Sequence, residues 1–175
     1  NKKDIAIKAV KIIDNRPSKH AKYELAVVKI VKHPNIVMHF SYFRASNRIF
    51  SVMEYVPDGT LGKFIKDKPF VNFATLKRMF YDILCAINYL HINNIAHRDI
   101  KDENIVLKIK HSDYPIPKLC DFGFSVRLNS QYDLCTNYCG TRSFKSPELI
   151  HAEGPYNPFR ADIWALGILL HKMLI

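Results

Sequence analysis

Apolar and polar residues alternate at the start of the chain and predict a β-strand. Within residues 4–13, Ile5 and Ile7 fall on one face and the residues between them on the other. A period of two is typical of a strand. Two further strands are expected at about 36–43 and 48–54, because a short polar turn separates two apolar runs there.

A helical stripe lies between the first and second of these strands. Leu25 and Val28 fall on one face of a helix predicted over residues 18–32. Pro34 ends the segment, since the residue before a proline avoids the α conformation. The strand, the helix and the two following strands together predict a small, mainly β unit.

The rest of the chain has helical character. Residues 57–59 (Pro-Asp-Gly) are a turn signal and mark the expected boundary between a small lobe, residues 1–56, and a larger lobe, residues 57–175. A long helix is expected from residue 73, because apolar residues recur there three or four positions apart. These residues are Phe73, Leu76, Phe80, Ile83, Ile87 and Leu90. Their burial would contribute on the order of 10 kcal/mol before entropy is subtracted.

Composition agrees with a folded globular chain. Of its 175 residues, 48% are hydrophobic and 24% charged, and 11 Phe and 9 Tyr supply apolar surface that disordered chains lack. The net charge is +10, but Lys and Arg are spread along the sequence, which favours an ordinary basic surface over a nucleic-acid site. The strongest apolar run, residues 163–170, is shorter than the roughly 18 to 20 residues that span a bilayer. No membrane segment is therefore expected.

The four cysteines lie at positions 85, 120, 135 and 139, without a Cys-x-x-Cys pair. Reduced thiols are expected, as is typical of an intracellular protein of the cytoplasm or nucleus. No histidine follows Cys135 and Cys139 at zinc-site spacing, so a metal site there is not expected. The chain starts at Asn1 and ends inside an apolar helix pattern, and we read it as a segment of a longer protein.

Four short motifs carry the candidate chemistry. Lys8 ends the run Ile-Ala-Ile-Lys, residues 97–104 read His-Arg-Asp-Ile-Lys-Asp-Glu-Asn, residues 121–123 read Asp-Phe-Gly, and residues 146–148 read Ser-Pro-Glu. The pattern H-R-D-x-K-x-x-N arises by chance about once in three million positions. In this order the motifs resemble the signature set of eukaryotic protein kinases, and the resemblance covers the whole chain.

The resemblance implies an α+β, two-lobed protein kinase fold that is incomplete at both ends, with a small mainly β lobe containing one helix and a larger mainly helical lobe. It also implies a protein serine/threonine kinase that binds ATP and Mg²⁺ and transfers the γ-phosphate to Ser or Thr hydroxyls of a protein substrate. A monomeric catalytic domain is expected. Two alternatives stay open: a catalytically silent kinase-fold scaffold that binds protein partners, and a basic nucleic-acid binder.

The same resemblance assigns catalytic roles. Lys8 would hold the α- and β-phosphates of ATP, and Glu24 in the following helix would pair with Lys8. Asp99 would accept or orient the proton of the substrate hydroxyl. Lys101, two residues later, resembles the lysine of Ser/Thr kinases.

Cofactor positions follow from the resemblance as well. Asn104 and Asp121 match the two positions that bind Mg²⁺, and the ion would offset the repulsion between phosphates and nearby carboxylates. Ala6 and Val106 match the residues on either side of the adenine ring. Backbone groups of the hinge would hydrogen-bond adenine. The gatekeeper and hinge positions are Met53, Glu54, Tyr55 and Val56.

Other residues resemble structural positions of the family. One group matches the stacked column that links the lobes of active kinases: Val28, His39, His97 and Phe122. A place in this column makes His97 a packing residue rather than a general base. Asp162 resembles the buried aspartate that holds the backbone of the catalytic loop.

Regulatory positions are the least defined. Arg98 would normally bind a phosphorylated residue of the activation segment, for which Thr136 is the leading candidate and Ser130 and Tyr132 are others. Thr141 matches the threonine that contacts the catalytic aspartate in Ser/Thr kinases. Two hypotheses stay open: phosphorylation of Thr136 orders the segment through Arg98, or no phosphate is needed.

The chain also departs from the family pattern. Asp102 stands where a proline is more common in the catalytic loop. Thr60 stands where many kinases that prefer basic substrates carry a glutamate, which leaves substrate preference open. Residues 121–125, with Cys-Gly-Thr at 139–141, resemble most the calcium/calmodulin-dependent kinase group, including testis-specific Ser/Thr kinases.

Residues 1–175 on their own are expected to be poorly stable and nearly inactive. The glycine-rich phosphate loop would precede Asn1, and the arginine that usually pairs with Glu148 would follow Ile175. A buried carboxylate that loses its partner costs about 3–5 kcal/mol. Thermal melting of this segment with and without Mg-ATP checks the expectation, and a cooperative melt that Mg-ATP shifts by several degrees would contradict it.

Overall fold

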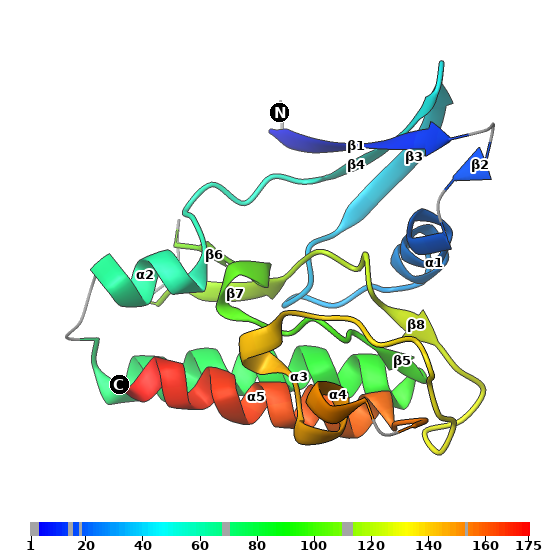
Figure 1. The fold of residues 1–175 in the computed structure, drawn as a ribbon. Helices are drawn as coiled ribbons and strands as arrows, with labels where there is room; N and C mark the ends of the chain where they lie inside the picture. Colours follow the sequence, from blue (N-terminus) through cyan, green and yellow to red (C-terminus); the bar gives the residue numbers. More distant parts are fainter. Residues whose placement is uncertain (1–3, 14–15, 18, 68–70, 110–113, 153) are drawn as a thin grey trace.

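Figure 1 shows the computed structural model of the chain, in which a small sheet lies above a layer of helices. The structure describes residues 4–13, 16–17, 19–67, 71–109, 114–152 and 154–175. Most of the sheet forms from the first part of the chain, and helices dominate the rest. The α+β fold with a β-rich small lobe and a larger helical lobe is confirmed.

The sheet of the small lobe is antiparallel, in the order β2-β1-β4-β3. Its strands are β1 (Ile5–Ile13), β2 (Arg16–Pro17), β3 (His39–Ala45) and β4 (Arg48–Glu54). Lys8 of β1 pairs with Ser51 of β4, and Ala6 pairs with Met53. The ammonium of Lys8 reaches Glu24, so this face of the sheet points toward α1 (Lys19–Val28).

The larger lobe combines helices with short strands. The helices are α2 (Leu61–Asp67), α3 (Phe73–Ile92), α4 (Pro147–His151) and α5 (Pro158–Leu174), and η1 (Asp102–Asn104) and η2 (Arg142–Phe144) are single 3-10 turns. The strands are β5 (Ile95–Ala96), β6 (Ile105–Lys108), β7 (Ile116–Leu119) and β8 (Val126–Arg127). Because β5 pairs with β8 and β6 with β7, the loops that carry residues 97–104 and 121–123 lie side by side. Across the described residues, no helix combines the length and apolar character needed to cross a membrane.

The helix predicted for residues 18–32 is shorter in the structure, where α1 ends at Val28. Ile30 and Val31 both donate their N–H groups to the carbonyl of Val27, at 3.1 and 3.2 Å, and this turn closes the helix. Val31 is nevertheless buried, so its apolar character reflects packing of the turn. Residue 18, the predicted first residue, lies outside the described part of the chain.

The strand predicted from residue 36 begins instead at His39. The residues before it pair with the larger lobe: Val37 donates to the carbonyl of Leu119 at 2.9 Å, and Leu119 donates to the carbonyl of Asn35 at 2.8 Å. The side chain of Asn35 also donates to Pro117 at 3.1 Å. This segment therefore joins the two lobes, which a local apolar pattern does not distinguish from a strand of the small sheet.

The apolar stripe of α3 is partly wrong. Phe73 is 67% exposed, whereas Ile83, Ile87 and Leu90 are buried as predicted. Phe73 is the first residue of the helix, where the side chain of Asn72 caps the N–H of Ala74 at 2.8 Å, and the core does not extend to this end. Met79, which the stripe omitted, is fully buried.

One hydrophobic core extends across both lobes. It joins Val28 of α1 and Ile36 to Phe122, Leu107 and Met79 of the larger lobe. A separate, smaller cluster lies beneath the activation segment and consists of Leu149, Tyr156 and Ala161, with Cys135 and Tyr138 packed against it. The continuous core fixes the motif-bearing loops of the two lobes relative to each other.

Substitution of Met79 by alanine is expected to lower the free energy of unfolding by about 2–5 kcal/mol, because it leaves a cavity in the core. The matched variant Phe73→Ala removes an exposed side chain of the same helix and should change it by about 0.5 kcal/mol or less. Urea denaturation of the full-length protein measures both. Similar losses for the two variants would contradict the placement of α3.

Candidate active site

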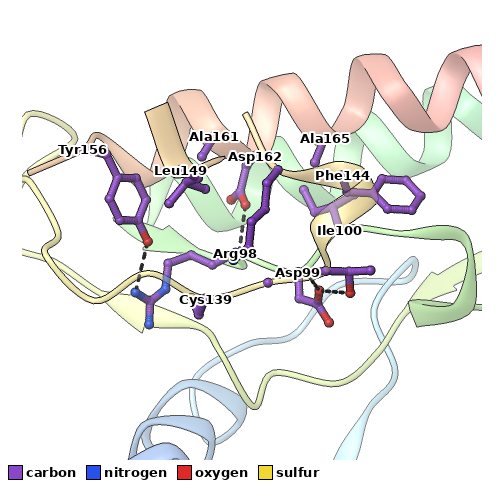
Figure 2. A pocket seen from close by; sticks show the side chains of 13 residues that line it. Arg98, Asp99, Ile100, Cys139, Phe144, Leu149, Tyr156, Ala161, Asp162 and Ala165 are labelled. Atoms are coloured by element: carbon purple, nitrogen blue, oxygen red, sulfur yellow. Dashed lines mark hydrogen bonds between the residues drawn. The ribbon is translucent and has the colours of Figure 1, made fainter. Parts of the chain in front are cut away.

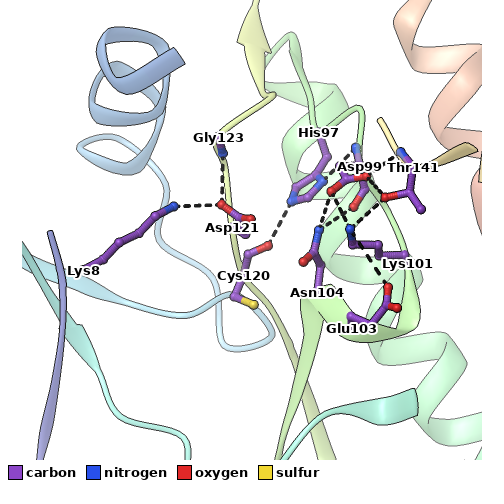
Figure 3. Close-up of polar contacts among 10 residues, drawn as sticks. All are labelled: Lys8, His97, Asp99, Lys101, Glu103, Asn104, Cys120, Asp121, Gly123 and Thr141. Carbon is purple, nitrogen blue, oxygen red and sulfur yellow. Dashed lines mark hydrogen bonds and ion pairs between the residues drawn. The ribbon is translucent and has the colours of Figure 1, made fainter. Parts of the chain in front are cut away.

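The carboxylate of Asp99 is the centre of a dense set of hydrogen bonds (Figure 3). Thr141 donates to its Oδ1 through the backbone N–H at 2.9 Å and through the hydroxyl at 2.7 Å. Lys101 Nζ lies 3.1 Å from Oδ2, and Asn104 Nδ2 donates to the same oxygen at 2.9 Å. Burial raises the pKa of Asp99, but the bonds from Thr141, Lys101 and Asn104 outweigh it and hold the pKa below its ordinary value. Asp99 is therefore ionised at neutral pH.

Lys101 and Thr141 are also joined to each other. The Lys101 ammonium donates to the hydroxyl of Thr141 at 2.7 Å, and that hydroxyl donates to Asp99. The predicted contact between Thr141 and the catalytic aspartate is thus confirmed. The half-buried Lys101 ammonium and the buried Asp99 carboxylate therefore lie side by side, where a hydroxyl group and a phosphate could both be held.

Asp162 fixes the backbone of the catalytic loop, as predicted. Its side chain is 1% exposed and accepts the N–H of His97 at 2.9 Å and of Arg98 at 2.8 Å. Arg98 has a φ of 66°, a left-handed conformation that costs a non-glycine residue about 1–2 kcal/mol. A Cβ on Gly140, whose φ is +90°, would lie 2.6 Å from the carbonyl oxygen of Arg98. Only glycine fits there, so the activation segment and the catalytic loop are in close contact.

Lys8 links the two lobes through charge. Its ammonium lies 2.6 Å from Glu24 Oε1 and 2.8 Å from Asp121 Oδ1, and Figure 3 shows the contact with Asp121. Burial lowers the pKa of Lys8, but the bonds to Asp121 and Glu24 outweigh it and raise the pKa above its ordinary value. Burial raises the pKa of Asp121, but the bond from Lys8 outweighs it and lowers the pKa. The predicted Lys8–Glu24 pair is confirmed, and Asp121 joins it.

His97 is a neutral packing residue, as predicted. It is fully buried, and its ring meets that of Phe122 edge-on, with centroids 5.1 Å apart. Nδ1 lies 3.3 Å from the N–H of Asp99 that donates to it, which leaves Nε2 to donate to the carbonyl of Cys120 at 3.2 Å. Burial lowers the pKa of His97. With both nitrogens used in the neutral form, His97 is not available as a base.

His39 is the first residue of β3, and its place in the stacked column stays a prediction. Its ring stacks on Tyr42, with centroids 6.0 Å apart, and its Nδ1 lies 2.8 Å from the Ser51 hydroxyl. Among the described residues, no ring contact joins His39 to His97 or Phe122. His39 also lies at a register shift in the pairing of β3 with β4.

The expected nucleotide positions lie along β1, β4 and β6. Ala6 pairs with Met53 across the sheet, and Val106 forms an isolated bridge with Thr60. The carboxylate of Glu54 binds Lys118 at 2.9 Å and Lys108 at 3.3 Å. Because its side chain is engaged there, Glu54 could contact a base only through its backbone, as the sequence implies for the hinge that continues to Tyr55 and Val56.

Asn104 and Asp121 present oxygen atoms that suit a hard cation. The amide nitrogen of Asn104 donates to the carbonyl and the carboxylate of Asp99, at 2.8 and 2.9 Å, which leaves its Oδ1 to act as a ligand. The Asp121 side chain is 48% exposed, and its Oδ1 takes Lys8 and, at 3.4 Å, the N–H of Gly123. One carboxylate and one amide oxygen are the donors that Mg²⁺ prefers when phosphates supply the rest.

Arg98 binds neutral groups in this structure. Its Nε donates to the carbonyl of Phe124 at 2.7 Å, and its Nη1 lies 3.3 Å from the carbonyl of Asn137 and 3.4 Å from the hydroxyl of Tyr156. Thr136, the predicted phosphorylation site, is exposed beside Asn137. The sequence did not identify Tyr156 as a partner of Arg98, because no motif near Tyr156 indicates that the two residues lie close together.

A second contact that the sequence did not reveal holds η1. Asp102 is buried, and its Oδ1 lies 2.8 Å from Nζ of Lys172 in α5. A Cβ on Gly62 of α2 would lie 2.3 Å from Asp102 Oδ2, so the helix passes directly over the carboxylate. The aspartate in place of the common proline was the available signal, but its partner lies far away in the sequence.

The expectation that Glu148 is a buried carboxylate is wrong. Glu148 lies in the first turn of α4 and is exposed, so water solvates its charge. The neighbouring Ser146 is the buried residue, and its hydroxyl has no hydrogen-bond partner among the described residues. The cost assigned to an unpaired, buried Glu148 therefore does not apply to this chain.

Comparisons with known proteins agree with this geometry. The family model described as protein kinase domain matches residues 1–175. An Aurora kinase of Eremothecium gossypii is 34% identical over 173 residues, which are 97% of this chain and 45% of that protein. The NUAK family SNF1-like kinase 2 of Rattus norvegicus is 34% identical over 97% of this chain and 26% of its own length. The human putative serine/threonine-protein kinase PRKY is 36% identical over 93% of this chain and 56% of its own.

The chain thus spans between about a quarter and somewhat over half of these relatives, from 26% to 56% of their length. Relatives of similar identity carry the names of different kinases, including a putative sperm motility kinase W of Mus musculus at 34%. The narrower resemblance to the calcium/calmodulin-dependent group therefore stays a prediction.

Replacement of Lys172 by methionine is expected to lower the free energy of unfolding by about 1–3 kcal/mol, because Asp102 then keeps a buried charge without its cation. The control Lys77→Met removes an exposed lysine of α3 and should change it by less than about 0.5 kcal/mol. Chemical denaturation of the full-length protein gives both values. If Asp102→Asn does not reduce the effect of Lys172→Met, the ion pair is not its cause.

Proposed function

Because this chain belongs to the protein kinase family, we propose that the protein containing it is an ATP-dependent kinase that phosphorylates Ser and Thr residues of protein substrates. The observation that carries the proposal is Lys8, whose ammonium binds Glu24 and Asp121 together at 2.6 and 2.8 Å. Phosphoryl transfer in this family requires the lysine–glutamate pair, here Lys8 and Glu24, to be in place. It also requires the aspartate of the Asp-Phe-Gly motif, here Asp121. Here the two lobes already bring them together.

The residues around Asp99 account for the transfer step. Asp99 is ionised and would accept or orient the proton of the incoming hydroxyl, while Lys101, 3.1 Å away, would stabilise the negative charge of the phosphate in transfer. Thr141 fixes the carboxylate through two hydrogen bonds to one oxygen. Lys8 on the opposite side would bind the α- and β-phosphates. Asp99 would thus act on the proton of the hydroxyl, and Lys101 and Lys8 would neutralise the charge of the phosphates.

Binding of ATP and Mg²⁺ is supported by the oxygen donors and the hinge. Asn104 and Asp121 would hold the metal ion, which neutralises phosphate charge when bound. The adenine ring would lie between Ala6 and Val106, beside Met53 and the backbone of the hinge residues Glu54 and Val56. All these residues lie in the described part of the chain.

The scaffold alternative has no observation in its favour. The curated relatives carry the names of kinases. The residues proposed to be catalytic form two bonded groups, one around Lys8 and one around Asp99. A monomeric catalytic domain without nucleic-acid or membrane partners, in the cytoplasm or nucleus, completes the proposal. Four cysteines without a disulfide are compatible with that location.

Asp99→Asn and Asp121→Ala in the full-length protein should each reduce phosphate transfer from radiolabelled ATP by about 10²-fold or more, through loss of the proton acceptor and of a metal ligand. Asp67→Asn, at an exposed position of α2, serves as the matched control and should keep full activity. Matched peptides that differ only in Ser, Thr or Tyr at the target position test the choice of hydroxyl. Unchanged transfer in both site variants would refute the proposal, and equal labelling of the Tyr peptide would refute its Ser/Thr preference.

A further inference from the structure

The guanidinium of Arg98 lies among three neutral acceptors that come from separate parts of the chain. Phe124 follows the motif of residues 121–123, Asn137 belongs to the activation segment, and Tyr156 precedes α5. Figure 2 shows the hydroxyl of Tyr156 pointing at the guanidinium from beside α4. One side chain of the catalytic loop thereby contacts residues 124 and 137 of the activation segment and Tyr156 beyond it.

Tyr156 is held in place by the smaller core cluster. It is 3% exposed, and its backbone exchanges two hydrogen bonds with Cys135, at 2.8 and 2.9 Å. Its ring stacks on Tyr138, with centroids 5.9 Å apart, and Tyr138 in turn donates to the carbonyl of Gly154 at 2.7 Å. The ring therefore has little freedom to leave Arg98.

The hydroxyl of Tyr156 both accepts and donates. It accepts from Arg98 Nη1 at 3.4 Å and donates to the carbonyl of Asn137 at 3.1 Å, while the same Nη1 reaches that carbonyl at 3.3 Å. Burial raises the pKa of Tyr156 to about 12, so the hydroxyl keeps its proton. Arg98, Tyr156 and Asn137 form a closed triangle of hydrogen bonds.

We propose that Tyr156 is a positioning residue that holds Arg98, and with it the catalytic loop, in the active arrangement without a phosphate on the activation segment. Asp99 directly follows Arg98, whose N–H is fixed by Asp162 and whose carbonyl lies against Gly140. Tyr156 also fixes the side chain of Arg98. The catalytic loop and residues 124–137 are then both anchored through Arg98. The inference rests on the proposed kinase function and concerns how its site is kept in order.

A phosphate on Thr136 would be a different anchor for the same guanidinium. Thr136 is exposed, and its neighbour Asn137 already occupies Arg98 through a carbonyl. A phosphorylated Thr136 would bind Arg98 as an anion and make the hydroxyl of Tyr156 dispensable. The two arrangements therefore predict opposite effects of phosphatase treatment.

The test uses the full-length protein after phosphatase treatment and steady-state kinetics with a Ser peptide. Dephosphorylated wild type and Thr136→Ala should keep the activity of the untreated protein. Tyr156→Phe should lower kcat about tenfold with an unchanged KM for ATP, as the loss of one hydrogen bond to a charged group implies. Tyr81→Phe makes the same chemical change at an exposed tyrosine of α3 and should stay within about twofold of wild type.

A double-mutant cycle separates positioning from general destabilisation. In the background of Arg98→Ala, Tyr156→Phe should have no further effect on kcat, because its partner is already absent. An equal loss in both backgrounds, or full activity of Tyr156→Phe, would overturn the proposal. Loss of activity on dephosphorylation, reproduced by Thr136→Ala, would overturn it in favour of the phosphate anchor. An untreated wild type without any phosphate transfer would instead refute the proposed kinase function.

Discussion

The buried carboxylate of Asp162 is the constraint on which the site depends. A carboxylate in the core that lacks hydrogen-bond donors costs several kcal/mol, so its partners have to stay in place. Those partners are the backbone N–H groups of His97 and Arg98 and the ring nitrogen of His91 at 2.9 Å. Their position sets the chain direction at Arg98, where φ is 66°, and hence the place from which Asp99 faces the surface.

Charge is matched locally around this loop. Lys8 binds carboxylates from both lobes, and Asp99 is paired with Lys101. Arg98 differs, because its described hydrogen bonds go to carbonyls and a hydroxyl, and the thiols of Cys135 and Cys139 lie nearby. Neutral acceptors orient a guanidinium without cancelling its charge, so Arg98 can still attract an anion. Ion pairs therefore hold the residues of the site together, whereas neutral groups orient Arg98 and leave its charge in place.

The residues that we propose to be catalytic were identified from short motifs whose order is characteristic of the family. Lys101 and Asn104 lie close to Asp99 in the sequence, and the structure keeps them close in space. Predictions from periodicity were less exact. The stripe of α3 included Phe73 and omitted Met79, because an apolar residue at the end of a helix can extend past the core that buries the middle.

The sequence by itself determined the kinase fold, the motifs that carry the proposed catalytic set and the approximate positions of the strands and helices, since these depend on residues near each other in the chain. Only the tertiary structure decided where α1 and β3 begin or end, that Glu148 is exposed, and that Tyr156 and Lys172 reach Arg98 and Asp102. Each of these depends on contacts between distant segments. Such contacts form only when the whole core packs, and no local pattern of residue types records them.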